Sequence, residues 1–493
     1  TLHLEGADVL VTNEPVAATM NQLVVSQDDF TTGGFSRYEV VANAGDMVVD
    51  AVLKPIMQNY GFDSSASSLS TASQNHGRGL ILTPSGASMA DLSTIKTLAD
   101  SERGPIDLQF SLAQVETDAV QNLIVTDRAR IDVDPGARVD LNSDTSIYMA
   151  GKLNAKAADV SLTIDTPSLP TGYLDNQAIW LADGSVIDVS STAVYAFDDR
   201  GLQIGEVFDA GKVALTANRG FVIIDDGAVV DVSASAETVD LLVKNSDLGA
   251  AFQPFSVAPK AGSVDILAAE GIVIDGELKA QAAPLVGAEG GQLSLALDTN
   301  IRNVTVDANN LLPGVGLEKF SFDARDIVVV DALGKRLADD ASFGDAIDSN
   351  LQGLAYLDAA EAEASGFDTI KLKTDHIATG GLSAASEIRF ESDVEISVDN
   401  SVVLSAPVIN SNDHDVQIDA AYVSLGSDSR SRNSVATTPT KGLQAFTVSA
   451  GLVDIVGDVE ITGTERVNIN ASDDIRFIGA QTAQTIEQLT GSL

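Results

Sequence analysis

The chain contains no cysteine, which excludes disulfides, a thiolate metal site and a cysteine nucleophile. Aromatic residues make up only 5%, and no apolar run approaches the length of a membrane-spanning helix, so we expect no span. The first residues, Thr1 to Thr12, lack the basic and then apolar layout of a signal peptide. Basic residues are also scarce, 29 against 71 acidic ones, and the net charge of -42 argues against a nucleic-acid or anionic-membrane partner.

Apolar residues, mainly Val, Ile, Leu and Ala, nevertheless make up 44% of the chain. That share is too high for a disordered acidic tail and is sufficient for a substantial core. Forty glycines, with frequent Asp, Asn and Ser, supply many turns. Because the composition never changes abruptly, we predict one continuous region over residues 1–493.

The most informative pattern is an imperfect repeat of glycine, a small residue, any residue, a β-branched residue, aspartate, an apolar and a polar residue. It occurs at Gly136–Asn142, Gly184–Ser190 and Gly227–Ser233. The glycines are 48 and 43 residues apart, which we interpret as two turns of a solenoid with coils of roughly 20 to 25 residues.

Short segments that alternate apolar and polar residues surround these glycines, for example Lys212–Ala217 and Ser263–Ala268. The alternation continues to Ile475–Phe477 and does not restart every ~100 residues, as separate β-sandwich domains would. The pattern therefore predicts an all-β protein, a right-handed parallel β-helix of ~20 coils with adjacent strands ~4.8 Å apart.

Four stretches interrupt the alternation. Ala87–Arg103 and Ala346–Ala364 are predicted as helical insertions, the second ended by Gly366. Gly61–Gly79 and Ser427–Thr440 are predicted as exposed loops. These loops either carry binding specificity or are merely tolerated insertions.

The sequence resembles the filamentous-haemagglutinin-like exoproteins of two-partner secretion, especially their large internal β-helical region. The resemblance rests on the order of several segments along most of the chain. They are Phe30–Tyr38, the repeats at Gly184 and Gly227, Gly271–Ala280, Gly366–Leu372 and Ser401–Ile409.

This resemblance implies export through an outer-membrane transporter partner and a place at the bacterial cell surface. It implies a non-catalytic shaft of a secreted fibre or adhesin that acts in adhesion, matrix formation or self-association, with a host or glycan receptor as partner. A stalk for a contact-dependent toxin is an alternative. The chain lacks the family's N-terminal secretion domain with its Asn-Pro motifs and any recognisable C-terminal toxin or anchor, so we expect it to be an internal section.

A β-helical polysaccharide lyase or hydrolase is the enzymatic alternative, because such enzymes place carboxylates along one wall. The chain has five acidic pairs: Asp28-Asp29, Asp198-Asp199, Asp225-Asp226, Asp339-Asp340 and Asp473-Asp474. It lacks the Gly-His-Gly and Arg-x-Lys segments of that hydrolase class. Asp225-Asp226 before Gly227 is more simply a turn, so we predict no catalytic site.

No metal or cofactor site is firmly indicated. The four histidines, His3, His76, His376 and His414, have no metal-ligand spacing, and Asn412–Asp415 is more typical of a solvated turn. Calcium is the better candidate, because stacked coils would bring Asp140, Asp188 and Asp231 into carboxylate rows. The repeat does not match the glycine-rich nonapeptide calcium pattern, and a solvated acidic face is the favoured alternative.

Overall fold

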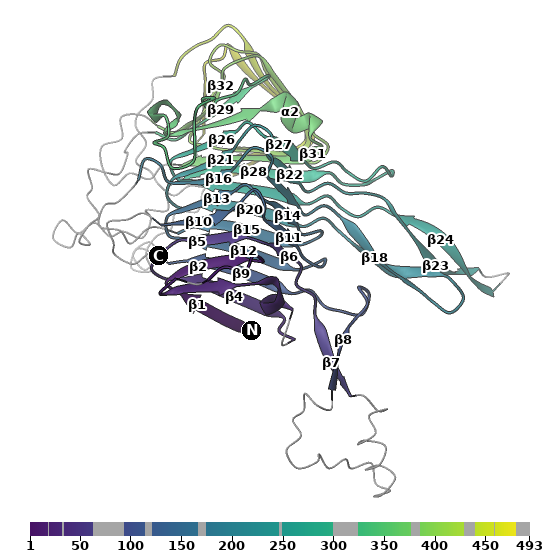
Figure 1. The fold of residues 1–493 in the computed structure, drawn as a ribbon. Coiled ribbons are helices and arrows are strands. Elements are labelled where there is room, and N and C mark those ends of the chain that lie inside the picture. Colours follow the sequence, from purple (N-terminus) through teal and green to yellow (C-terminus); the bar gives the residue numbers. More distant parts are fainter. Residues whose placement is uncertain are drawn as a thin grey trace, which may run out of the picture.

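The computed structural model describes residues 1–17, 19–31, 34–62, 93–113, 121–165, 174–245, 249–298, 324–375, 385–427, 439–457 and 459–479. Three parallel sheets run side by side along the molecule (Figure 1). In spatial order, sheet A contains β1 (Leu2–Gly6), β4 (Arg37–Ala42), β9 (Asp107–Leu112), β12 (Arg138–Ser143), β15 (Asp159–Ile164), β20 (Lys212–Ala217), β25 (Ser263–Ala268), β28 (Gly291–Asp298), β31 (Phe367–Asp375), β34 (Ser401–Ser405), β36 (Val416–Gly426), β37 (Ala445–Val456) and β39 (Arg466–Ile478), with β33 (Val394–Ser397) beside β36.

Sheet B contains β3 (Gln22–Val25), β2 (Asp8–Thr12), β5 (Met47–Asp50), β10 (Asn122–Val125), β13 (Ser146–Met149), β16 (Ala178–Leu181), β21 (Phe221–Ile224), β26 (Gly271–Ile274), β30 (Leu354–Asp358), β29 (Asp326–Val330), β32 (Glu387–Phe390), β35 (Val408–Asn410) and β38 (Glu460–Thr462). Sheet C contains β27 (Glu277–Lys279), β22 (Val229–Asp231), β17 (Val186–Asp188), β14 (Lys152–Asn154), β11 (Arg130–Asp132) and β6 (Val52–Leu53).

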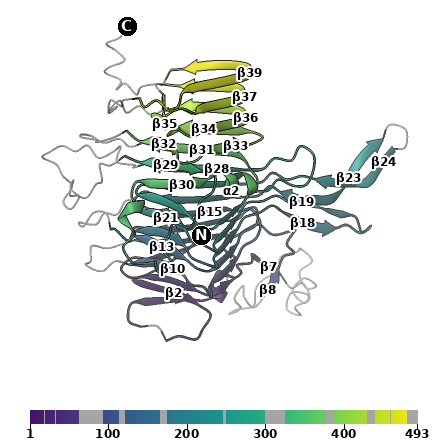
Figure 2. The same ribbon diagram turned by 90° about the horizontal axis from the view of Figure 1, so that it is seen from above.

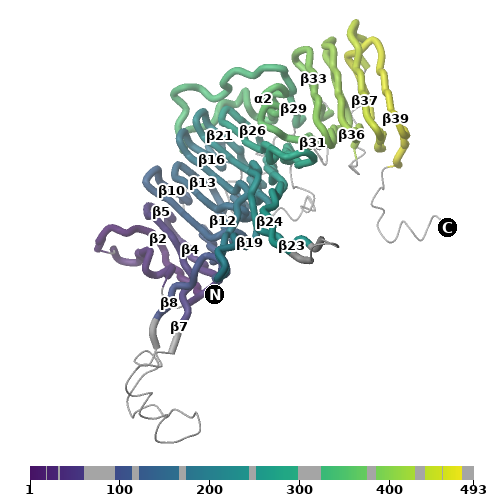
Figure 3. The backbone as a smooth tube through the Cα atoms, turned by 90° about the vertical axis from the view of Figure 1, so that its right-hand side faces the viewer, coloured from purple at the N-terminus to yellow at the C-terminus, as the bar shows by residue number. Residues whose placement is uncertain are grey.

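From β4 to β27 the chain visits the three sheets in turn, so that β12, β13 and β14 form one coil and β15 begins the next above β12. Among the described residues after β27, the coils contribute strands to sheets A and B only. Each strand pairs in parallel with its counterparts in the neighbouring coils, and the coils stack from the N-terminal to the C-terminal end (Figure 3). The predicted all-β parallel β-helix is therefore confirmed. Among the described residues sheet A holds 14 strands, fewer than the ~20 coils expected from coils of roughly 20 to 25 residues, because hairpins and other insertions lengthen several coils.

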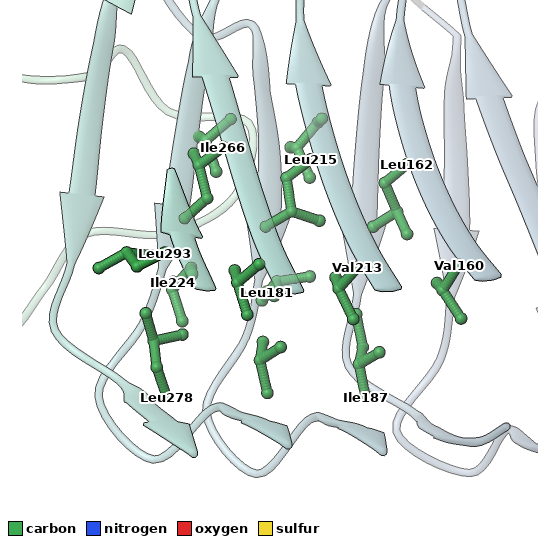
Figure 4. Packing of buried hydrophobic residues seen from close by; sticks show 14 of the residues in the cluster. Val160, Leu162, Leu181, Ile187, Val213, Leu215, Ile224, Ile266, Leu278 and Leu293 are labelled. Carbon is green, nitrogen blue, oxygen red and sulfur yellow. The ribbon is translucent and has the colours of Figure 1, made fainter. Parts of the chain in front are cut away.

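The core is a set of aliphatic rows inside the coil. Alternate residues of each strand point inward, so Val160 lies opposite Val213, and Val213 opposite Val264, in successive coils (Figure 4). All three are almost completely buried. Burial stabilises each such side chain by about 1.5–3 kcal/mol. The alternation seen in the sequence thus becomes a continuous core.

The length of a coil differs from our interpretation of the repeat. Asp188 and Asp231 are direct partners in β17 and β22, so the 43-residue spacing is one coil and not two. An earlier coil, from β11 to β14, has only 22 residues between aligned positions. The longer coil contains an inserted hairpin. The segment at Gly136 leads into sheet A, whereas those at Gly184 and Gly227 lead into sheet C, so the three segments are not equivalent.

The backbones of neighbouring coils approach one another closely just before the strands of sheet A begin. A Cβ on Gly211 would lie 1.9 Å from the Ala158 carbonyl oxygen, and one on Gly262 would lie 1.9 Å from that of Gly211. Neither glycine has a positive φ. Glycine is therefore required here by the contact between coils and not by backbone conformation.

Three antiparallel hairpins are inserted between sheet C and the next strand of sheet A. They are β7 (Gln58–Phe62) with β8 (Ser93–Thr97), β18 (Thr192–Phe197) with β19 (Gln203–Phe208), and β23 (Glu237–Asn245) with β24 (Gly249–Val257).

The predicted helix Ala87–Arg103 is wrong in its described part, because Ser93–Thr97 pairs with β7 as a strand. Apart from Gly61 and Phe62 in β7, the predicted loop Gly61–Gly79 lies outside the described residues. Most of Ser427–Thr440 lies outside them too, leaving only Ser427, Pro439 and Thr440.

The order of strands is inverted at two places in sheet B. β3 follows β2 in the chain yet lies on the side of β2 away from β5. β30 follows β29 in the chain yet lies between β26 and β29 in the sheet. The connection, residues 331–353, crosses the outer face of sheet B, and we call it the strap. The amides of Arg336 and Leu337 donate to the Asp275 carboxylate, and the Ile347 amide donates to the Asp175 carbonyl at 2.9 Å.

The predicted helix Ala346–Ala364 is correct only at its end. The segment forms a 3₁₀ turn, η5 (Ser349–Leu351), then strand β30, and only then helix α2 (Ala359–Ala364). Asp358 caps α2, and Gly366 follows it with φ +86°, as expected for a glycine after a helix. Another 3₁₀ turn, η1 (Gln27–Phe30), buries Phe30 at the N-terminal end. Within the described ranges, no helix is both long and apolar enough to cross a membrane.

Candidate interaction surface

The acidic calcium candidates do not form one row. Asp188 and Asp231 are neighbours on the outer face of sheet C, whereas Asp140 lies on sheet A between Gln109 and Ser161. The prediction of equivalent positions is therefore wrong for Asp140. Among the described residues, no group of three or more His, Asp or Glu side chains is arranged to hold a metal.

Each of these carboxylates has donors within reach. Asp140 accepts from Arg138 Nε at 2.8 Å and from Ser161 Oγ at 2.5 Å. Asp188 lies 2.6 Å from Lys156 Nζ and accepts from the Ser190 amide and hydroxyl. Partial burial alone would raise the pKa of Asp188, but the Lys156 ammonium and the Ser190 donors hold it below its usual value. Local cations and hydroxyls therefore balance this charge.

Two of the acidic pairs considered for catalysis lie in turns. Asp198 accepts from the amides of Arg200 and Leu202 in the turn between β18 and β19. Asp225 accepts from the next amide, and Gly227 has φ +86°. The turn interpretation of Asp225-Asp226 is thus confirmed.

The histidines that the structure describes are not brought together. His3 lies 3.4 Å from Glu5 and from Glu39 near the N-terminus. His414 follows Asn412 and Asp413, which both have positive φ in a tight turn between β35 and β36. His76 and His376 lie outside the described residues.

One cluster of charged side chains, which contains a carboxyl group with a raised pKa, was not predicted from the sequence. On the outer face of sheet B, Arg389 contacts Asp326 at 3.2 Å, Glu387 at 2.9 Å and Glu391 at 3.1 Å. Burial and the charge of Glu387 raise the pKa of Asp326 to about 6, against the opposing effect of Arg389. Glu387, Arg389 and Glu391 lie two residues apart in one coil, but Asp326 comes from the neighbouring strand β29, so no local spacing indicated the cluster with Asp326.

The most distinctive surface feature is a lateral arm made of two neighbouring hairpins, β18–β19 and β23–β24. It extends from the stacked coils (Figure 2). Hydrogen bonds join the hairpins. Tyr195 Oη donates to the Glu237 carboxylate at 2.5 Å, and the backbone amide of Gln203 donates to the Asp240 carboxylate at 2.7 Å. The Arg200 guanidinium lies 4.8 Å from the ring centroid of Phe252. The arm is therefore a packed unit and not two independent loops.

The arm exposes large apolar side chains on both faces of β23–β24. Leu241 (44% exposed) and Phe255 (54%) lie on one face, and Leu242 (51%) lies on the other because successive strand residues point in opposite directions. Phe197 (70%) and Ile204 (38%) add to this surface on the first hairpin. Several large apolar side chains exposed on one projection are typical of interaction surfaces.

The outer strand of the arm is protected from adding another strand. Pro254 stands in the middle of β24, which pairs only with β23 among the described strands. Proline lacks the amide hydrogen that strand pairing needs and occurs at sheet edges. Strand addition at the edge of β24 is therefore disfavoured, whereas both faces of β23–β24 remain open to a partner.

Fold and surface together define a class of protein, a parallel β-helix that carries a lateral hairpin arm. Comparison with known proteins gives no closer assignment, because no family model, curated protein or solved structure matches the chain.

Proposed function

We propose that this chain is a non-catalytic shaft of a secreted bacterial fibre or adhesin, with the arm as its contact surface. The observation that carries the proposal is the exposure of Leu241, Leu242 and Phe255 on a braced projection. The stacked coils supply a continuous rod from which the arm stands out (Figure 2). Export through a two-partner outer-membrane transporter and a place on the cell surface are proposed on the family resemblance.

The strong acidity bears on how such rods associate. A net charge of -42 keeps copies apart at low ionic strength, so apolar contacts between rods require screening. We expect light scattering to rise along a salt and calcium titration. A flat titration would exclude self-association as the mode of matrix formation.

The arm is tested with a paired substitution, Leu242→Ser with Phe255→Ser. Beads coated with this variant should lose binding to one another or to cultured cells, whereas the wild-type chain binds. The matched control is Val16→Ser with Met20→Ser, which removes two other exposed apolar side chains (47% and 91%) away from the arm. Equal binding by wild type and both variants would exclude the arm as the contact surface.

A glycan-cleaving function is the second candidate, and the Asp326 cluster is the observation that favours it. A carboxyl with a pKa of about 6 suits a general acid at neutral pH. Against this role, Arg389 contacts all three acidic side chains, so the cluster resembles a structural ion network. Incubation with acidic polysaccharides, with reducing ends and unsaturated products measured, separates the two. Turnover that Asp326→Asn abolishes would replace the shaft proposal.

A further inference from the structure

The outer face of sheet B carries an apolar row that crosses nine consecutive strands. It contains residues that lie in register from one strand to the next: Val24, Leu10, Val48, Ile124, Tyr148, Trp180, Ile223, Val273 and Tyr356. The equivalent outer row of sheet A in the same part of the molecule is polar, as Glu39, Gln109, Asp140 and Ser161. An apolar outer row is thus a specific property of sheet B.

The strap covers the C-terminal part of this row. Leu337, Phe343 and Leu351 of the strap pack on Trp180, Ile223 and Val273, which are at most 4% exposed. The Phe343 ring lies 4.8 Å from Tyr148 and 6.4 Å from Trp180. The Asn176 side chain also donates to the Gly344 carbonyl at 2.9 Å. The molecule itself therefore shows what binds this surface: an extended polypeptide with large apolar side chains at intervals.

The N-terminal part of the row continues beyond the strap. Val24, Leu10, Val48 and Ile124 keep the same line and spacing, and each is partly exposed. Phe343 reaches only as far as Tyr148, the next member of the row. The covered and the uncovered parts thus form one continuous surface.

Acidic side chains border the uncovered part on both sides. Asp8 is the first residue of β2, and Asp46 immediately precedes β5. Asp50 lies at the end of β5, where Arg128 pairs with it. Beyond β10, burial and the nearby charge of Asp127 raise the pKa of Tyr148. A partner that carries Lys or Arg beside its apolar residues would complement this border.

We propose that the row from Val24 to Ile124 is a docking surface for an extended, basic and apolar segment of a second polypeptide, which lies on sheet B as the strap does. Apolar side chains of the partner continue the line of Leu337 and Phe343, and its cationic side chains face Asp8, Asp46 and Asp127. This docking surface is separate from the arm and does not depend on the arm's role.

The probe is a labelled synthetic peptide of residues 332–353 with lysine at four aspartate positions: Asp339, Asp340, Asp345 and Asp348. Fluorescence anisotropy with the full chain should show saturable binding. We expect the Kd to rise at least tenfold with Ile124→Lys and to rise with salt, and to be unchanged with Ser161→Lys on sheet A. The unaltered acidic peptide should bind at least tenfold more weakly.

Trp180 is the only tryptophan of the chain and lies beneath the strap, so its emission reports the strap's position. Emission that stays constant during peptide binding supports docking on the N-terminal row. A red shift means that the peptide displaces the strap, which overturns the proposal, as does absent binding or a Kd that Ile124→Lys leaves unchanged. If Ile124→Lys does not fold, Val48→Ser carries the same comparison.

Discussion

Asp188 of β17 lies directly opposite Asp231 of β22 in the next coil, so two carboxylates occupy neighbouring positions on sheet C. Each accepts the amide of the serine two residues further on, Ser190 and Ser233. Only Asp188 also contacts a cation, Lys156. Local hydrogen-bond donors and cations, which differ from one coil to the next, therefore offset the repulsion between these two carboxylates.

We expect Lys156→Gln to lower the free energy of unfolding by about 0.5–1 kcal/mol at pH 7, since the pair is partly exposed and screened. Because the pKa of Asp188 is lowered in the folded state, its stabilisation is present above its unfolded pKa of about 3.9 and is lost as the pH falls through the folded value. Thermal melts of both proteins at pH 7 and pH 3 measure this difference. In an Asp188→Asn background, Lys156→Gln should have no further effect; a second, equal loss there would contradict the pairing.

For Asp326 we expect the opposite dependence of stability on pH. Its folded pKa of about 6 lies above the unfolded value, so the native state binds more protons between about pH 4 and pH 6 and loses stability as the pH rises through that window. Asp326→Asn should flatten this part of the stability curve and melt at or above the wild-type temperature at pH 7. Denaturation midpoints at pH 4.5 and 7 test it. Identical pH dependence in both proteins would show that Asp326 titrates normally.

Val213→Asp should disrupt the inner row, because it places an unpaired carboxylate between Val160 and Val264. The expected loss is several kcal/mol. Thr216→Asp is the matched control, since Thr216 is on the same strand and points outward. Equal circular-dichroism melts for the two variants would contradict the assignment of inward and outward faces.

Gly262→Ala tests the close approach of coils without changing charge. Its Cβ would meet the Gly211 carbonyl oxygen of the coil below, and we expect a loss of about 1–3 kcal/mol or more from the forced displacement. Gly104→Ala is the control, because its nearest atom is Met57 Cε at 3.9 Å. A melting temperature for Gly262→Ala equal to that of the control would mean that the coils separate at little cost.

The sequence by itself determined which side chains of many coil strands face inward, and it determined some of the turns. Alternation in Lys212–Ala217 specifies which side chains face inward, since a strand has a period of two wherever it lies. The turn at Asp225-Asp226-Gly227 was equally predictable, because Asp and Gly favour it through their own backbone geometry.

Only the tertiary structure decided which strands are neighbours. The composition of Ala346–Ala364 favours a helix, yet Leu354–Asp358 became β30 because it pairs with β29 on one side and lies beside β26 on the other. The 43-residue spacing was interpreted as two coils because nothing local reveals that the insertion β18–β19 leaves the stack. The arm, the strap and the Asp326 cluster join residues from different coils, and such contacts depend on long-range pairing that local alternation does not encode.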